Sequence, residues 1–148
     1  MRFIIANKIE DTYDELISSW WGKPKTLHLD ACGASEYTDG YNIYIKNELA
    51  ENCKNKLYFV NLGGYNSNEF NELQKNVFIL VPNESKAKVK ALKQILDRKA
   101  HHRDYQFEVE DILDVSCILS ENKKYVHLEQ TDVEHKFEFI CKYTPIRK

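Results

Sequence analysis

The stretch KLYFVNLGGY, residues 56–65, is the centre of the predicted fold. It reads as a buried strand, because an apolar, β-prone run leads into two glycines and a tyrosine. Paired glycines after such a strand either form a turn or let a backbone come close to a ligand such as a phosphate. The stretch has neither P-loop spacing nor the glycine spacing of a dinucleotide-binding loop, so both interpretations stay open.

Similar segments occur twice along the chain, which predicts an internal duplication. NKLYFVNL (55–62) is similar to NKKYVHLE (122–129), and FIIAN (3–7) is similar to FILVPN (78–83). A predicted amphipathic helix follows each member of the second pair. Because these segments keep the same order, together with an H-x-D motif and a later Asp, we predict two copies of a β-α-β-β-β unit.

The predicted fold class is α+β, a single compact domain over residues 1–148 with mostly antiparallel sheet. The two copies are expected to span residues 2–63 and 77–130 and to pack about a pseudo-twofold axis. Residues 64–76 are expected to form the connecting loop. HKFEFICKYTPI alternates apolar with charged residues, which predicts a C-terminal strand at about residues 135–143.

Two amphipathic helices are predicted, each beginning at a capping residue. Thr12 opens the first with a Thr-x-x-Glu capping box, and Ser85 opens the second. In each helix apolar residues recur three and four positions apart, which places them on one face. We expect both faces to point into one core. The inward residues are Tyr13, Leu16, Ile17, Trp20, Trp21, Val89, Leu92, Ile95 and Leu96.

The composition is that of a soluble globular protein, with 43% hydrophobic and 30% charged residues. A net charge of −2 does not indicate a nucleic-acid or membrane partner. A membrane span needs about 18 apolar residues, and no run approaches that length. The apolar run after Met1 is also too short for a signal peptide. We predict a cytoplasmic protein and leave export by a specialised secretion system open.

The cysteines are scattered, with no C-x-x-C pair: Cys32, Cys53, Cys117 and Cys141. Without a secretory signal, such cysteines are expected to be reduced and unpaired. Their spacing does not support a zinc site, so no metal site is predicted.

Several segments together resemble the family called domain of unknown function 1543, uncharacterised bacterial proteins. They are LHLDA and DGYNIYI, KLYFVNLGGY with the following F-x-E-L, and the later H-x-D. The resemblance covers most of residues 20–118, and FVNLGGY is its most specific element. It implies a histidine after F-x-E, where this chain has Gln74, and an earlier LGG strand in longer members, which is missing here. It implies no activity, substrate or cofactor.

The glycine pair is the first candidate site. The second predicted copy has no glycine at the equivalent strand, so Gly63 and Gly64 serve a turn, a close backbone approach or a ligand particular to the first copy. Tyr41 and Tyr65 would add rings on which a nucleobase can stack. Our first hypothesis is a non-enzymatic module that binds a small anionic or aromatic, nucleotide-like ligand at these four residues. The cofactor is unknown.

The H-x-D motifs support an alternative hypothesis. His28 and Asp30 share one face of a predicted strand, and His102 with Asp104 would be the second pair. Two such pairs could form a metal-dependent or acid–base hydrolase site. No nucleophile elbow, H-E-x-x-H or deaminase signature is present, so no catalytic residue is assigned. A third hypothesis is a protein-interaction domain that pairs through an exposed sheet edge.

Overall fold

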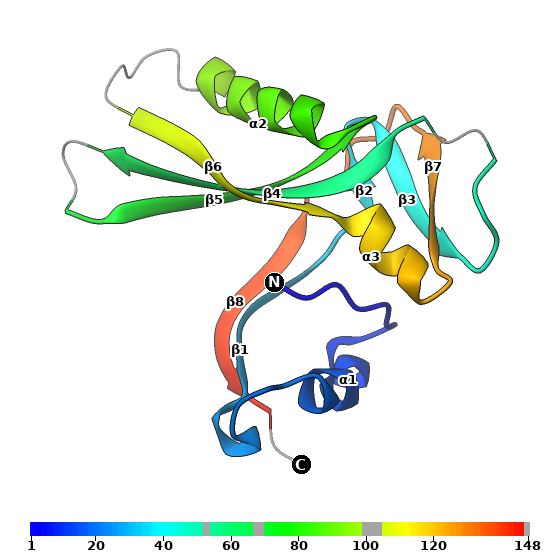
Figure 1. Cartoon of the computed structure of the whole chain (residues 1–148), viewed down its shortest axis with the longest axis vertical. Helices are drawn as coiled ribbons and strands as arrows, with labels where there is room; N and C mark the ends of the chain where they lie inside the picture. The colour runs from blue at the N-terminus through cyan, green and yellow to red at the C-terminus, as the bar shows by residue number, and fades with distance from the viewer. Residues whose placement is uncertain (52–53, 67–69, 99–104, 147–148) are drawn as a thin grey trace. The chain divides into compact units, whose positions relative to one another are not determined.

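The computed structural model describes residues 1–51, 54–66, 70–98 and 105–146. The strand pairings within them are antiparallel, and the predicted α+β class is confirmed. In chain order the elements are η1 (Ile9–Thr12), α1 (Tyr13–Ser18), η2 (Pro24–Thr26), β1 (His28–Ala34), β2 (Tyr37–Thr38), β3 (Tyr41–Lys46), β4 (Lys56–Asn66), β5 (Glu72–Val81), α2 (Glu84–Arg98), β6 (Tyr105–Asp114), α3 (Val115–Glu121), β7 (Tyr125–Gln130) and β8 (Glu138–Pro145) (Figure 1).

The contacts group the chain into two compact units, where the sequence predicted one domain over residues 1–148. Unit 1 comprises Met1–Glu36 and His135–Lys148, and unit 2 comprises Tyr37–Glu134. Unit 1 contains the two-stranded sheet β1-β8. Unit 2 contains two three-stranded sheets, β2-β3-β7 and β5-β4-β6.

The core of unit 2 lies between α2 and the sheet β5-β4-β6 (Figure 1). β4 is the central strand of this sheet, so the prediction of a buried strand at KLYFVNL is confirmed. Tyr58, Val60 and Leu62 alternate toward α2 and join the core. The helix meets them with Ala87 and Ala91, whose small side chains let the helix backbone approach the sheet closely.

A tight turn holds the sheet β2-β3-β7 of unit 2 against the edge of β5. Asp39 and Gly40 form the β2–β3 turn with φ of 54° and 84°, as in a two-residue type I′ hairpin. Thr38 Oγ1 donates a hydrogen bond to Phe78 O at 3.0 Å, and Leu80 N donates one to Asp39 Oδ2 at 2.8 Å. The turn therefore satisfies backbone groups that an edge strand would otherwise leave to solvent.

Unit 1 is a ribbon of β1 and β8 accompanied by α1. Ile146 N donates a hydrogen bond to Leu27 O at 3.0 Å, and both side chains are buried. Along β8 itself nearly every side chain is exposed. The C-terminal strand spans Glu138–Pro145, two to three residues later than the predicted 135–143.

The predicted duplication is not shown. Residues 3–7 form no strand, and α1 is followed by β1, β2, β3 and β4, whereas β5 is followed by α2, β6, α3 and β7. The two halves, 2–63 and 77–130, therefore differ in element order. Their similarity consists of apolar runs and helical periodicity, which unrelated amphipathic elements share. The predicted loop 64–76 is also wrong at both ends, because β4 continues to Asn66 and β5 begins at Glu72.

The predicted helix faces are partly wrong. α1 buries none of its residues, and Trp21 is 86% exposed, so the expected inward face of this helix is not buried. In α2, Ile95 is buried and Leu92 is partly buried, but Val89 is 67% exposed because the face toward the sheet is centred on the alanines. The side chain of Leu96 lies outside the described part of the chain.

The capping predictions are also partly wrong. Lys86 N donates a hydrogen bond to Asn83 Oδ1 at 3.1 Å, so Asn83, and not Ser85, caps α2. Thr12 lies at the N-cap position of α1, as predicted, but its Oγ1 donates a hydrogen bond back to Ile9 O at 2.6 Å, so the predicted side-chain cap is not formed. The sequence shows residues able to cap a helix but not where the chain begins to turn.

Candidate functional site

The glycine pair lies inside β4, with a strand on each side. Gly63 is opposite Gln74 of β5 and Glu108 of β6, and Gly64 continues the same pairing. Among the described glycines, a positive φ occurs at Gly40 and not at this pair. The interpretation of LGGY as a turn is therefore wrong, and so is its description as a loop. That these glycines serve ligand binding stays a prediction.

A β-bulge in β6 lies opposite the Asn61–Leu62 step of β4, just before the first glycine. Asn61 is opposite Asp111, but the next residue of β4, Leu62, is opposite Val109, which leaves Glu110 as the extra residue. In a regular strand neighbouring side chains alternate between faces. Here Val109 packs toward the α2 core, and the bulge places the two carboxylates that follow it on the opposite face.

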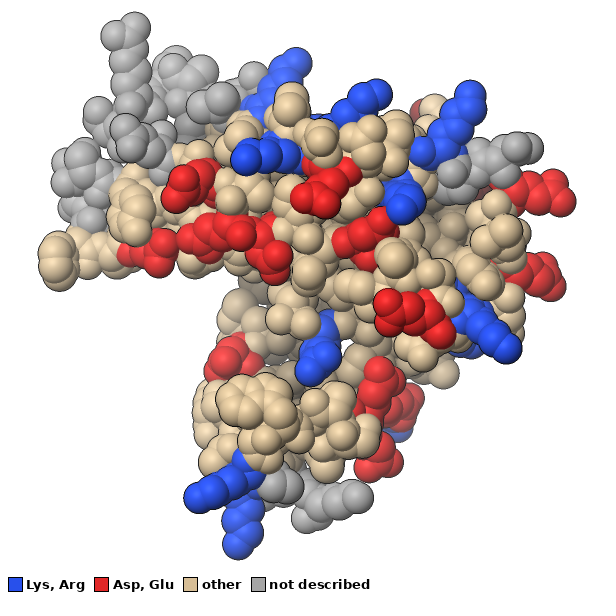
Figure 2. Space-filling view, viewed as in Figure 1, with Lys and Arg blue, Asp and Glu red and all other residues tan. Residues whose placement is uncertain are grey.

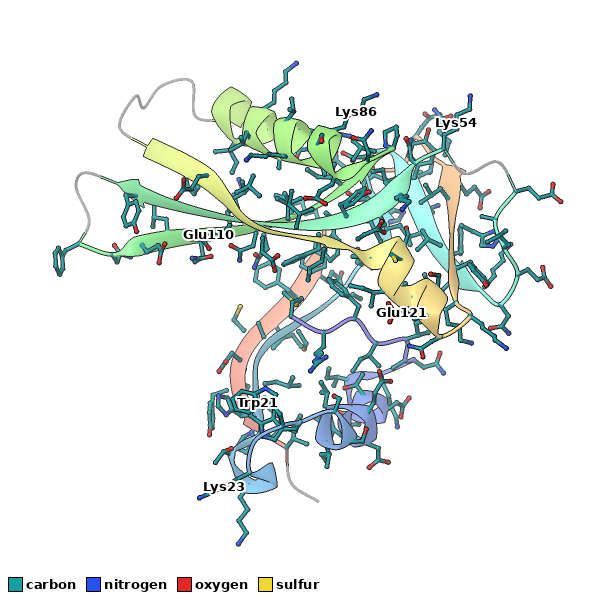
Figure 3. All side chains as sticks on the ribbon, in the orientation of Figure 1. Trp21, Lys23, Lys54, Lys86, Glu110 and Glu121 are labelled. Atoms are coloured by element: carbon teal, nitrogen blue, oxygen red, sulfur yellow. The ribbon has the colours of Figure 1, made fainter. Side chains whose placement is uncertain are left out.

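Glu110 lies across β4. A Cβ atom at Gly63 would collide with the Glu110 carboxylate, so the missing side chain makes room for this residue. On the far side, Gln74 Nε2 donates a hydrogen bond to Glu110 Oε2 at 3.0 Å. A carboxylate from β6 thus reaches β5 across the central strand (Figure 3). This contact explains the glycine: a strand residue without a side chain marks a close approach.

Amide side chains extend the same face beside Glu110. Asn61 Nδ2 donates a hydrogen bond to Asn76 Oδ1 at 2.9 Å. Asn61 Oδ1 is enclosed and has no hydrogen-bond partner within the described ranges. We name this surface the β4 polar patch, which consists of Asn61, Gly63, Gln74, Asn76, Glu110 and Asp111.

The surroundings of the β4 polar patch are acidic. Glu72, Glu108, Glu110 and Asp111 are exposed and lie on the face of the sheet away from α2. Figure 2 shows acidic side chains in a row along β6, whereas lysines lie along α2. Tyr65, at 62% exposure, adds an accessible aromatic ring opposite Glu72.

A second charged cluster lies at the other end of β4. Lys56 Nζ is 2.8 Å from Asp114 Oδ2, and Asp114 Oδ1 also accepts a hydrogen bond from Cys117 N, capping α3. The hydrogen bond to Asp114 raises the pKa of Lys56. Burial raises the pKa of the neighbouring Tyr58, because the phenolate would lose its hydration. We interpret this cluster as structural, since it joins β4 to α3.

The residues of the hydrolase hypothesis are only partly described. His28 Nε2 and Asp30 Oδ1 lie 3.4 Å apart, so the expected contact within the first H-x-D pair is present. The other ring nitrogen of His28, Nδ1, is 2.9 Å from Thr26 O. His102 and Asp104 lie outside the described residues, and the proposed meeting of two pairs stays a prediction. Tyr41 lies in the other sheet, opposite Gln130 of β7.

The thiols and metal ligands give no further site. Cys32, Cys117 and Cys141 are free, as predicted, and Cys53 lies outside the described residues. In the described part of the chain, no three His, Cys, Asp or Glu side chains come together in a way that could hold a metal ion. No helix within the same ranges has both the length and the apolar character to cross a membrane.

One protein-family model matches part of the chain. Residues 1–45 match the family model of DUF1543, Domain of Unknown Function. The resemblance seen in the sequence is thus supported over a shorter and earlier range than the predicted 20–118. The matched range includes His28, Asp30 and Tyr41 but ends before the β4 polar patch.

The fold has a counterpart among solved structures. The crystal structure of a protein Il1583 from Idiomarina loihiensis aligns with a TM-score of 0.69 and 25% sequence identity. The alignment covers 99% of this chain and 84% of that one. None of the curated proteins compared matches the chain.

Sequence reasoning found Gly63 and Tyr65 but missed Glu110, Asp111 and the two asparagines. A signal was present in YQFEVEDILD, where alternation of apolar and acidic residues breaks at two adjacent acids. Such a break in a strand indicates a bulge. What the sequence could not show is that the side chain of the extra residue, Glu110, reaches Gly63.

Proposed function

We propose that the protein is a non-enzymatic binding module whose ligand site is the β4 polar patch. One observation carries the proposal: Glu110, displaced by the bulge, occupies the space left by Gly63 and hydrogen-bonds to Gln74. Bulges and strand glycines are both frequent where a sheet is adapted to hold a ligand. Here the bulge lies beside Leu62, next to the glycine in β4, and its Glu110 side chain places a carboxylate over the central strand.

The charge of the patch selects the class of ligand. Four exposed carboxylates lie on this face of the sheet, and a phosphate brought to them would be repelled. We therefore replace the anionic ligand of our first hypothesis with a cationic one. A group with several N–H donors fits best, because a carboxylate accepts two parallel hydrogen bonds from a guanidinium or amidinium group.

Tyr65, which lies beside the patch on strand β4, favours the same ligand. Tyr65 offers a ring on which a planar cation can stack. We infer a small, planar, cationic ligand, such as a guanidinium or aminated heterocycle, that contacts the carboxylates with its N–H edge and the tyrosine with its face.

The test is an NMR titration of the full chain labelled with nitrogen-15. Agmatine and adenine serve as donor-rich probes, and inorganic phosphate and AMP serve as anionic probes. We expect agmatine to shift the amide signals of Asn61, Gly63 and Gln74 in a saturable way. AMP, which adds a ribose and a phosphate to the same base, is expected to shift them less than adenine does.

Matched variants separate a specific site from general attraction to acidic surface. Glu110→Gln and Asp111→Asn keep the size of each side chain but remove its charge, and they should weaken agmatine binding. Glu121→Gln removes an exposed carboxylate at the end of α3 and should leave binding unchanged. Shifts that respond equally to all three variants, or that favour phosphate, would contradict the proposal.

A further inference from the structure

The outer edge of β8 forms a second candidate interaction surface, in unit 1. β8 pairs with β1 along one edge, and the sheet contains just these two strands in the part of the chain that is described. Large apolar side chains of β8 are exposed: Phe139 by 63%, Ile140 by 63% and Tyr143 by 64%. A two-stranded ribbon has little stability of its own, and an open strand edge is a template for pairing with another strand.

The sequence of β8 is complementary to itself in one antiparallel register. Two copies of a strand that pair about a twofold axis place each residue opposite its mirror position about a central residue. With Ile140 at the centre, Glu138 lies opposite Lys142 of the second copy, and Phe139 lies opposite Cys141. The pairing thus brings two opposite-charge pairs and an apolar centre together.

The neighbouring registers lack this complementarity. Centred on Phe139, the pairing places Glu138 opposite Ile140 and Lys136 opposite Lys142 of the second copy. A register centred on Cys141 instead places Ile140 opposite Lys142. Charges of one sign directly opposite each other destabilise a sheet, and opposite charges stabilise it. Among these registers, the charge pattern of β8 therefore favours the one centred on Ile140.

We propose that the partner of this edge is a second copy of the same chain. β8 would pair antiparallel with its equivalent about Ile140, and the two ribbons would join into a four-stranded sheet of order β1-β8-β8-β1. The small residues of β1 leave room for the aromatic face of this sheet, because Gly33 lies beneath Phe137 and opposite Phe139. The proposal concerns unit 1 and is independent of the ligand site in unit 2.

The first test is a charge exchange, measured by sedimentation equilibrium of the full chain. Glu138→Lys and Lys142→Glu each place like charges opposite each other twice per dimer, and each should weaken dimerisation about tenfold. The double variant E138K/K142E restores opposite charges and should restore the wild-type dissociation constant. Far-UV circular dichroism checks that each variant keeps the fold, as expected for exposed residues.

The second test determines the register by cross-linking. In a background with all native cysteines replaced by serine, Ile140→Cys should form a covalent dimer on mild oxidation. Directly opposed strand residues have Cα atoms about 4.5–5.5 Å apart, within disulfide range. A background that retains Cys141 as its one cysteine is the control. There the two sulfurs are diagonal, about 7–8 Å apart between residues, and should not cross-link.

Three results would overturn the proposal. One is a wild-type protein that stays monomeric at all concentrations measured. Another is a dimer that tolerates Glu138→Lys and Ile140→Lys without weakening, which places the interface elsewhere. A third is cross-linking through Cys141 in preference to Ile140→Cys, which shows a different register.

Discussion

Replacing Asp39, in the β2–β3 turn, by alanine is expected to destabilise unit 2. Asp39 connects three elements, because its carboxylate accepts hydrogen bonds from Leu80 N of β5 at 2.8 Å and from Lys90 Nζ of α2 at 2.7 Å. Gln94 Nε2 lies 3.4 Å from its other oxygen. The side chain of Asp39 is only 16% exposed, so its partners depend on it more than on water.

The expected cost follows from three separate losses. Leu80 N would lose its acceptor, and an unsatisfied buried donor costs about 1–3 kcal/mol. The ion pair with Lys90 is partly exposed and contributes about 0.5 kcal/mol after screening. Alanine at the left-handed φ of 54° adds about 1 kcal/mol. We predict that Asp39→Ala lowers the free energy of unfolding by about 3 kcal/mol.

Urea denaturation followed by circular dichroism measures this loss, and hydrogen exchange at Leu80 N locates it. Asp39→Asn is the matched control, because asparagine tolerates a positive φ and still offers an oxygen to Leu80 N. It should cost about 1 kcal/mol or less. The reasoning is refuted if Asp39→Ala costs under 1 kcal/mol, or if exchange at Leu80 N is as slow as in the wild type.

Three further predictions concern packing and pH. Leu62 is fully buried in the core, so Leu62→Ala should cost about 2–5 kcal/mol in urea denaturation. Trp21→Ala should change the same free energy by less than about 0.5 kcal/mol, since the side chain is 86% exposed. The folded-state pKa values of Lys56 and Tyr58 are both raised, so each group binds its proton more tightly in the folded protein. Their contribution to the free energy of unfolding is fully present below about pH 10 and is lost as the pH rises through the raised pKa values. A series of denaturation curves at alkaline pH will show this loss as falling stability. Lys56→Met should make that fall less steep, and an unchanged pH profile would contradict the assignment.

The central sheet could be predicted from sequence to the extent that its strands are continuous apolar runs. Residues 57–60 of β4 are buried on both faces of the sheet, and such a continuous apolar run can be recognised from the sequence without knowledge of its neighbours. The helices were less predictable. α1 has an apolar stripe as regular as that of α2, yet it buries no residue, because periodicity indicates a face and not a partner.

The candidate site could be predicted only in its β4 half. Glycine occurs in turns, in loops and at close backbone approaches alike. The sequence therefore did not show which of these three roles Gly63 and Gly64 have. The deciding contact, with Glu110, joins residues 47 positions apart and depends on the register between β4 and β6. Register depends on the whole sheet. The sequence of β6 therefore shows that a bulge is present, but it does not show which residue of β4 lies opposite it.

The most direct test of the binding site is the affinity of Gly63→Ala for agmatine, measured by isothermal titration calorimetry beside the wild type. The added methyl group would displace Glu110 from β4. Losing the exposed hydrogen bond to Gln74 costs about 0.5–1.5 kcal/mol, and the gain from a less flexible unfolded chain is about 0.4–1 kcal/mol, so stability should change little. We predict a stable variant that binds agmatine at least about tenfold more weakly than the wild type. Equal affinities in the two proteins, or no binding by the wild type, would contradict the account.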